Sequence, residues 1–260
     1  MPFADADGVR VYYEVHGEGP AVVLAHGAGG NHAIWWQQVP YFRERYSLIA
    51  LDLPGFGNSR SERDEYDTHE YPAQILAVLD DAGIERAALV GQSLGAPPCL
   101  SVAVHNPARV AGVVLANSIG GIADEEIMAM VLADRAAAEK LPVLDRLLRR
   151  RFREREPEKV FLFEQIGTFN AAKVPKLRNQ WVGTTTLTQI EAAIAAGVRV
   201  CYIGGDEDAV LAPATYERLR RLLPQAIVNV VEGAPHSLYW EAPELFNPAL
   251  EQMLGTIYRN

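Results

Sequence analysis

Apolar and polar positions follow two different periods along most of this chain. Short apolar runs typical of buried strands lie at residues 21–25, 46–51, 87–90 and 110–116, and residues 71–82 and 94–105 carry apolar side chains at helical spacing. Residues 9–14 predict a further strand before the turn at 16–20. Strands that alternate with helices favour parallel pairing through right-handed crossovers. The pattern therefore predicts an α/β fold, with a mostly parallel central sheet that helices flank on both faces.

This alternation stops after residue 118. About eighty residues give only helical patterns, and a strand resumes at 198–204, followed by a helix near 215–222, a strand at 226–231 and a C-terminal helical segment. We therefore expect one α/β domain in two parts, residues 1–118 and 197–260, with a helical cap inserted at residues 119–196. The cap contains large apolar side chains that either pack its own core or roof a cleft: Met128, Met130, Phe161, Phe163, Phe169 and Trp181.

Charge narrows the classes of partner. The chain has 24 basic and 33 acidic residues, and a net charge of −9 argues against binding along a nucleic-acid backbone. No apolar stretch approaches the roughly 20 residues that a membrane helix needs, and the N-terminus lacks a basic region followed by an apolar one. We therefore expect a cytoplasmic protein without membrane contacts. Its two cysteines, Cys99 and Cys201, lie in apolar segments and are expected to be small buried side chains.

The basic run at residues 146–155 has a simpler explanation than an anion site. Its arginines are interleaved with Asp145, Glu154 and Glu156. Such interleaving is typical of ion pairs within a helix on a solvated face, and we prefer that interpretation to a clamp for an anionic substrate.

Residues 89–96 predict a nucleophile elbow. An apolar run breaks into Gly91-Gln92-Ser93-Leu94-Gly95, and a helical segment follows. A side chain at the tip of a tight strand-to-helix turn needs small neighbours two residues away on either side, which Gly91 and Gly95 provide. The N-terminus of the following helix would present free N–H groups to a developing oxyanion.

Ser93 then requires a base and an acid that orients the base. His236 follows the last predicted strand, where the strand ends meet, and is the candidate base. Three carboxylates, Asp206, Glu207 and Asp208, follow the preceding strand. Spacing alone leaves the choice among them open.

Taken together, these segments resemble the α/β-hydrolase superfamily over nearly the whole chain, in the order Ser, acid, His. The matching motifs are His26-Gly27-Ala28-Gly29-Gly30, Asp52-Leu53-Pro54-Gly55-Phe56-Gly57-Asn58-Ser59, the elbow, Gly205-x-x-Asp208 and His236. The resemblance implies that Asp208, rather than Asp206, completes a catalytic triad. It also implies an oxyanion hole formed by the backbone N–H groups of Ala28 and Leu94.

The residues around these donors are expected to form the substrate pocket. We assign Gly27, Gly29, His32 and Gln92 to it, together with Trp181 of the cap; for His32, a role as a helix cap is the alternative. The glycines after His26 lack the third glycine of a dinucleotide loop, and no histidine or cysteine pair has metal-site spacing. We therefore expect neither a metal nor a cofactor.

Serine at the elbow indicates acyl transfer. The cap and the Gly-Gly that follows His-Gly are similar to those of carboxylesterases, enol-lactonases and carbon–carbon hydrolases of ring-fission products. We favour hydrolysis of a small ester or lactone through an acyl-enzyme on Ser93. Carbon–carbon cleavage is the alternative, although Gln92, Leu94, Ala96 and Ser237 depart from the pattern of that group. A small-ligand receptor, a lyase that uses His236 as base, and a homodimer by analogy also stay open.

Overall fold

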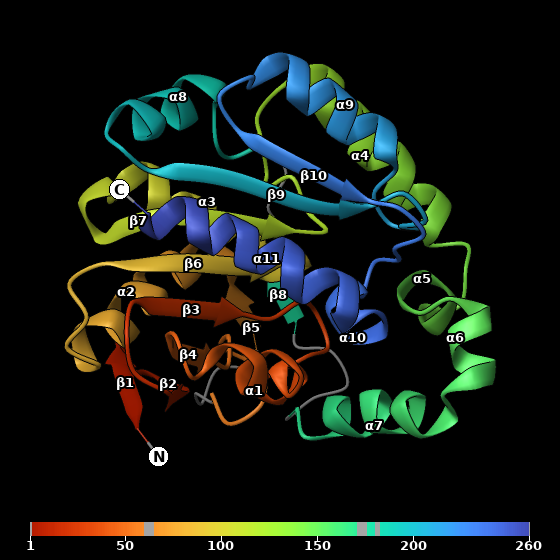
Figure 1. Cartoon of the computed structure of the whole chain (residues 1–260), viewed down its shortest axis with the longest axis horizontal. Helices are drawn as coiled ribbons and strands as arrows, with labels where there is room; N and C mark the ends of the chain where they lie inside the picture. The colour runs from red at the N-terminus through yellow and green to blue at the C-terminus, as the bar shows by residue number, and fades with distance from the viewer. Residues whose placement is uncertain (1, 60–64, 171–175, 180–182, 260) are drawn as a thin grey trace.

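A central sheet of eight strands forms the middle layer of the molecule (Figure 1). The computed structural model describes residues 2–59, 65–170, 176–179 and 183–259. Within them the strand order is β1-β2-β4-β3-β6-β7-β9-β10; β2 pairs antiparallel with β1 and β4, and all other pairs are parallel. The strands are β1 (Phe3–Ala6), β2 (Val9–His16), β3 (Ala21–Ala25), β4 (Ser47–Leu51), β6 (Ala87–Gln92), β7 (Val110–Ala116), β9 (Arg199–Gly205) and β10 (Ile227–Val231). The predicted α/β fold with a mostly parallel sheet is confirmed.

Helices cover both faces of the sheet. Helices α2, α3, α8 and α9 contribute to one apolar core, and α1, α10 and α11 to the other. In the described residues the helices are α1 (Gln38–Phe42), α2 (Tyr71–Asp81), α3 (Ala96–His105), α4 (Glu125–Ala138), α5 (Val143–Leu147), α6 (Arg150–Arg155), α7 (Pro157–Thr168), α8 (Leu187–Ala195), α9 (Pro213–Leu222), α10 (Leu238–Glu241) and α11 (Pro243–Tyr258), with short 3₁₀ helices at His32–Trp35, Thr68–Glu70, Ser93–Gly95 and Pro107–Arg109. Both cysteines are buried in these cores, as predicted.

The inserted helices α4–α7 follow β7 and attach to both cores. Helix α4 packs against α9 and places Ile127 and Val131 in the first core, whereas Phe152 and Ile166 of α6 and α7 join the second. Figure 1 shows α5 and α6 at the right of the molecule, below α4 and α9, and α7 at the lower right. Helix α8 contacts α3, one of the helices that cover the sheet. The division into a cap at 119–196 and a core remains a prediction.

The large apolar side chains of the insertion have different surroundings. Phe161 and Phe169 are 63% and 67% exposed. Phe163 contacts the ring of Trp240 in the second core, with 5.1 Å between centroids. Met128 lines the cavity described below. Trp181 lies outside the described residues.

A small second sheet corrects the sequence prediction at two places. Strand β5 (Glu65–Asp67) lies between the strand predicted at 46–51 and the helix predicted at 71–82, where no strand was predicted, and β8 (Lys176–Arg178) lies in the insertion that was expected to be wholly helical. The two strands pair in parallel. A three-residue strand is too short to show an alternating pattern, and its partner lies far along the chain, so local sequence does not reveal this pairing.

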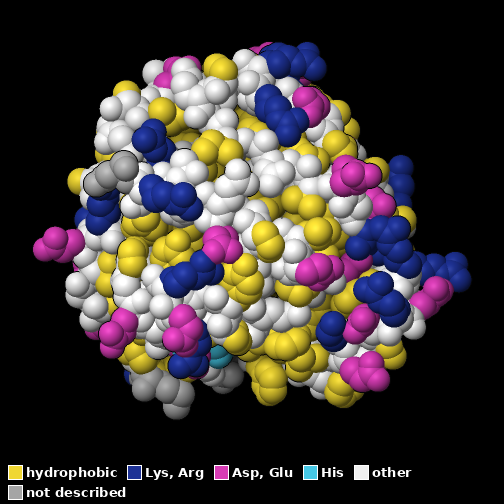
Figure 2. Space-filling view, in the orientation of Figure 1, with side chains coloured by type: hydrophobic (Ala, Val, Ile, Leu, Met, Phe, Trp, Pro, Cys, Tyr) yellow, Lys and Arg dark blue, Asp and Glu magenta, His cyan; other side chains and the backbone are white. Residues whose placement is uncertain are grey.

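The basic run links the insertion to the rest of the chain. Arg150 and Glu154 form an ion pair four residues apart, as predicted. The prediction of a solvated helix face is wrong for Arg149, which pairs with buried Glu241 and with Glu207; Arg151 also contacts Glu207. Figure 2 shows acidic and basic side chains intermixed at the right-hand edge, over α5 and α6.

Across the residues that the structure describes, no helix has the length and apolar character needed to cross a bilayer. The cytoplasmic location and the homodimer remain predictions.

Candidate functional site

The turn from β6 into α3 holds Ser93 in a strained backbone conformation. Ser93 has φ +47°, in the left-handed region that non-glycine residues rarely adopt. A Cβ atom at Gly91 would lie 2.4 Å from the Gly95 carbonyl oxygen, and one at Gly95 would lie 2.5 Å from the Ala25 carbonyl oxygen. The turn therefore packs against its own start and against the end of β3. Only glycine leaves enough space at either position.

We expect Gly95→Ala to lower the free energy of unfolding by about 2 kcal/mol or more, because the neighbouring atoms are backbone and cannot move aside easily. Urea denaturation of the two proteins measures this difference. Gly167→Ala in α7 is the matched control, since its Cβ would meet the nearest atom at 3.4 Å, an ordinary contact. That change should stabilise by about 0.5–1 kcal/mol. Equal stability of the two variants would contradict the close packing at the elbow.

Three side chains meet beside this turn. The Ser93 hydroxyl lies 3.1 Å from Nε2 of His236, and Nδ1 of His236 lies 2.9 Å and 3.0 Å from the two carboxylate oxygens of Asp208. Ser93 follows β6, Asp208 follows β9 and His236 follows β10, so all three come from the carboxyl ends of parallel strands in one sheet. Asp208 and His236 are buried, whereas Ser93 is partly exposed. The structure thus brings together the three residues that the sequence singled out.

The Asp208 carboxylate is held from several sides. One oxygen accepts the backbone N–H groups of Val210 and Leu211 at 2.8 Å and 3.1 Å, and the other accepts the side-chain amide of Asn117 at 3.0 Å. Asn117 directly follows β7 and also donates to the Pro235 carbonyl, next to the histidine. These contacts set the carboxylate in the position from which it accepts the imidazole N–H.

The neighbouring carboxylates do not contact the histidine. Asp206 accepts the backbone N–H of Gly233 at 2.6 Å and thereby ties the end of β9 to the loop that carries the histidine. Glu207 pairs with Arg149 and Arg151 of the insertion. Among the three acids that the spacing left open, only Asp208 makes a hydrogen bond with His236 in the described structure.

A cavity of about 230 Å³ opens beside Ser93 and His236. The other described residues that line it are Ala28, Leu94, Pro97, Asn117, Ser118, Ile119, Gly121, Ile122, Met128, Val131, Arg135, Leu177, Gly183, Val210 and Leu211. Both residues that the resemblance gave as oxyanion donors, Ala28 and Leu94, therefore border the same space as the serine hydroxyl.

A family model described as the alpha/beta hydrolase fold matches residues 20–243. The chain belongs to the α/β hydrolase family. The predicted resemblance is thereby confirmed, and hydrolases are among the chain's relatives and structural neighbours.

Relatives of this hydrolase differ in their recorded activities. The chain is 28% and 30% identical to the dihydrolipoyllysine-residue acetyltransferase components of the acetoin cleaving systems of Cupriavidus necator and Pseudomonas putida, over 97% and 96% of its length. It spans 68% and 66% of those proteins, or about two thirds. Among solved structures, it resembles a meta-cleavage product hydrolase from Pseudomonas fluorescens IP01, with a TM-score of 0.76 and 24% identity over 98% of both chains. The enol-lactonase from Burkholderia xenovorans LB400 gives 0.72 and 21%, over 97% of this chain and 99% of that one.

The pocket residues expected in this hydrolase need correction. Among the described residues, the cavity lining does not include Gly27, Gly29, His32 or Gln92. Gln92 is buried and donates its amide to the His236 carbonyl at 3.3 Å, and a Cβ at Gly27 would lie 2.0 Å from the Gln92 amide oxygen. Both residues therefore pack beside the elbow, and among the described residues they do not line the cavity. Trp181, the fifth expected residue, lies outside the described part of the chain.

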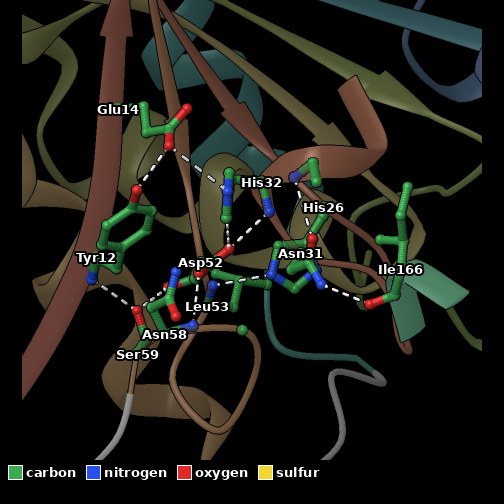
Figure 3. Close-up of polar contacts among 12 residues, drawn as sticks. Tyr12, Glu14, His26, Asn31, His32, Asp52, Leu53, Asn58, Ser59 and Ile166 are labelled. Carbon is green, nitrogen blue, oxygen red and sulfur yellow. Dashed lines mark hydrogen bonds and ion pairs between the residues drawn. The ribbon is translucent and has the colours of Figure 1, made fainter. Parts of the chain in front are cut away.

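His32 belongs to a buried polar network that holds the loop with Ala28 in place (Figure 3). The Asp52 carboxylate accepts the backbone N–H of His32 at 2.6 Å and its ring Nδ1–H at 2.8 Å, and it also accepts the Asn58 N–H at 2.7 Å. His26 accepts the Leu53 N–H through Nε2 at 2.9 Å. The segment between His26 and His32 is therefore tied at both ends to the turn that follows β4.

The charge of His32 should link stability to pH. Burial lowers the pKa of His32, but the hydrogen bond and charge of Asp52 and the charge of Glu14 raise it, and the net shift is upward. A raised pKa in the folded state stabilises below the unfolded value of about 6.5, and this contribution is lost as pH rises through the folded value. We expect the free energy of unfolding to fall between pH 6 and pH 8.5 by more in the natural protein than in His32→Gln.

Urea denaturation at the two pH values checks this expectation. The matched control is His105→Gln, because His105 is exposed at the end of α3. It should keep the pH dependence of the natural protein. If His32→Gln keeps it as well, the charge of His32 does not contribute.

Two residues of this site were not anticipated from the sequence. Asn117 carries a recognisable signal, since it is a polar residue directly after a fully buried strand. Arg135 of α4 lines the cavity but stands in an ordinary helical pattern, and its position depends on how α4 lies over the strand ends.

Proposed function

We propose that this chain is a serine hydrolase that cleaves an ester or a lactone of a small molecule through an acyl-enzyme on Ser93. The observation that carries the proposal is the continuous contact from the Ser93 hydroxyl through His236 to Asp208, at the edge of a cavity. A serine hydroxyl is a poor nucleophile at neutral pH unless a base takes its proton, and Nε2 of His236 lies within reach to do so. The similarity to an enol-lactonase supports the same class of reaction.

The proposed reaction has two stages. In the first, His236 takes the Ser93 proton while the serine oxygen attacks the carbonyl carbon, and Asp208 stabilises the imidazolium that forms. The backbone N–H groups of Ala28 and Leu94 stabilise the negative oxygen of the tetrahedral intermediate. His236 then gives its proton to the leaving alkoxide as the carbon–oxygen bond breaks. In the second stage, water attacks the acyl-enzyme with His236 again as the base, and the acid is released from Ser93.

The cavity suits a small substrate. Its volume of about 230 Å³ lies below the roughly 300–1,000 Å³ of pockets that enclose drug-sized ligands. Most of the side chains that line it are apolar, and such a lining favours a substrate with an apolar carbon chain next to the reacting carbonyl.

Labelling with a fluorophosphonate tests the proposal. The reagent should add once, and intact mass with peptide mapping should place the adduct on Ser93. The Ser93→Ala protein should not react. Ser118 lines the same cavity, so Ser118→Ala is the matched control and should label like the natural protein. The absence of an adduct, together with no turnover of p-nitrophenyl butyrate, would exclude an acyl-enzyme.

A further inference from the structure

Helix α4 directs one side of its surface to the cavity, and that side carries a single charge. Met128, Val131 and Arg135 line the cavity and are spaced three and four residues apart, so they share one face of the helix. Two of them are apolar. Among the described residues of the lining, Arg135 is the only lysine or arginine, and none is an aspartate or glutamate. The lining therefore includes one basic residue and, among the described residues, no acidic one.

Arg135 also has no ion pair elsewhere in the described structure, unlike Arg149, Arg150 and Arg151 of the same insertion. The charge of Glu139 favours the charged form of Arg135. Among the described residues, however, no carboxylate forms an ion pair with Arg135 within 4.0 Å. The adjacent acid, Asp134, accepts the backbone N–H of Ala212 at 2.9 Å instead. Loss of water contact lowers the pKa of the guanidinium. A partly desolvated charge without a partner is costly, and an anion bound in the cavity would remove that cost.

We infer that Arg135 binds a carboxylate of the substrate. This inference rests on the proposed hydrolase activity and specifies its substrate class: an ester or lactone whose acyl part carries a second, anionic carboxyl group. A guanidinium binds a carboxylate through two parallel N–H···O contacts. The protein as a whole is strongly acidic, with a net charge of −9, and repels small anions. A local cation is needed to hold such a substrate against that repulsion.

Matched pairs of esters test the inference. The probes are the monomethyl esters of succinate, glutarate and adipate, each beside its neutral terminal amide, and turnover is followed by the acid released in a pH-stat. The natural protein should prefer the best of the three acids to its amide by about 10-fold or more in kcat/KM. Arg135→Gln should lower kcat/KM for that acid by about 10- to 100-fold and leave the amide within about threefold. Arg135→Lys should retain part of the preference.

The control variant is Arg150→Gln, which changes an exposed arginine of the same insertion that pairs with Glu154. It should keep the natural preference for the acid. If Arg135 serves only the end of α4, Arg135→Gln will lower the melting temperature and change the rates for acid and amide equally. That result would overturn the inference.

Binding to the Ser93→Ala protein separates this inference from the proposed function. Calorimetry should show tighter binding of the monomethyl ester acid than of its amide, and the difference should vanish when Arg135→Gln is added. If the acid binds more tightly than the amide but neither the natural protein nor any variant hydrolyses the esters, the carboxylate site is retained and the acyl-enzyme is excluded. Turnover lost in Ser93→Ala, with equal or undetectable binding of acid and amide, would retain the hydrolase and exclude the carboxylate site.

Discussion

Replacing Ser93 by alanine should lower kcat for p-nitrophenyl butyrate by about 10⁴-fold or more. The methyl group cannot form the acyl-enzyme, and any residual rate would come from water activated by His236 beside the N–H groups of Ala28 and Leu94. Because Ser93 is partly exposed at the cavity edge, the change removes little buried contact, so the melting temperature should stay close to that of the natural protein. Initial rates from p-nitrophenol absorbance measure the effect.

A second variant shows whether the serine acts together with the histidine. We expect kcat of the double variant, Ser93→Ala with His236→Ala, to lie within a few-fold of kcat of Ser93→Ala alone. Residues that act as one unit give strongly non-additive losses. Ser118→Ala should retain most of the rate. If Ser93→Ala loses less than about 10-fold in kcat, Ser93 is not the nucleophile and water is activated directly.

Asp208→Asn should lower kcat by about 10³- to 10⁴-fold. The carboxylate accepts hydrogen bonds on both oxygens, from Val210 and Leu211 on one and from Asn117 on the other. An amide NH₂ placed at either oxygen would therefore meet a donor. An asparagine NH₂ group turned toward His236 would also favour the imidazole tautomer with its proton on Nε2. In that tautomer Nε2 cannot accept the proton of Ser93. Rates and circular dichroism of the purified variant separate this loss from unfolding.

Asp206→Asn is the matched control, because Asp206 lies two residues before Asp208 in the same loop. The Asp206 side chain accepts the Gly233 N–H through one oxygen, and an asparagine oxygen can accept the same bond. We expect less than a 10-fold change in kcat. If the two asparagine variants lose activity equally, the carboxylates act by holding the loop, and orientation of the histidine by Asp208 is excluded.

Local sequence was enough to predict most of the sheet layer. Five of the strands, β3, β4, β6, β7 and β9, are short apolar runs between turn residues, and burial on both faces requires that composition. The same reasoning located Ser93, because the tight turn needs a glycine on each side and the whole motif spans only five residues. It also placed His236 and the three acids at strand ends, where parallel strands bring distant segments together.

The resemblance, and not the spacing, chose Asp208 among those acids, and the contact with His236 became visible only in the folded chain. The pocket residues show the same limit. Gln92 and His32 adjoin motif residues in the sequence. In the folded chain, however, Gln92 donates a hydrogen bond to the His236 carbonyl, and His32 binds the Asp52 carboxylate. Which way a side chain points depends on the neighbours that pack against it, and those neighbours come from other parts of the chain.

The sequence by itself therefore determined the fold class, the order of most strands and helices along the chain and the candidate nucleophile, because each depends on residues close to one another in the chain. Tertiary structure alone decided the pairing of β5 with β8, the ties of Arg149 and Arg151 to the core, and the placement of Arg135 at the cavity. Each of these depends on how the inserted helices lie on the sheet. That packing is set by contacts between residues far apart in sequence, and no local pattern records it.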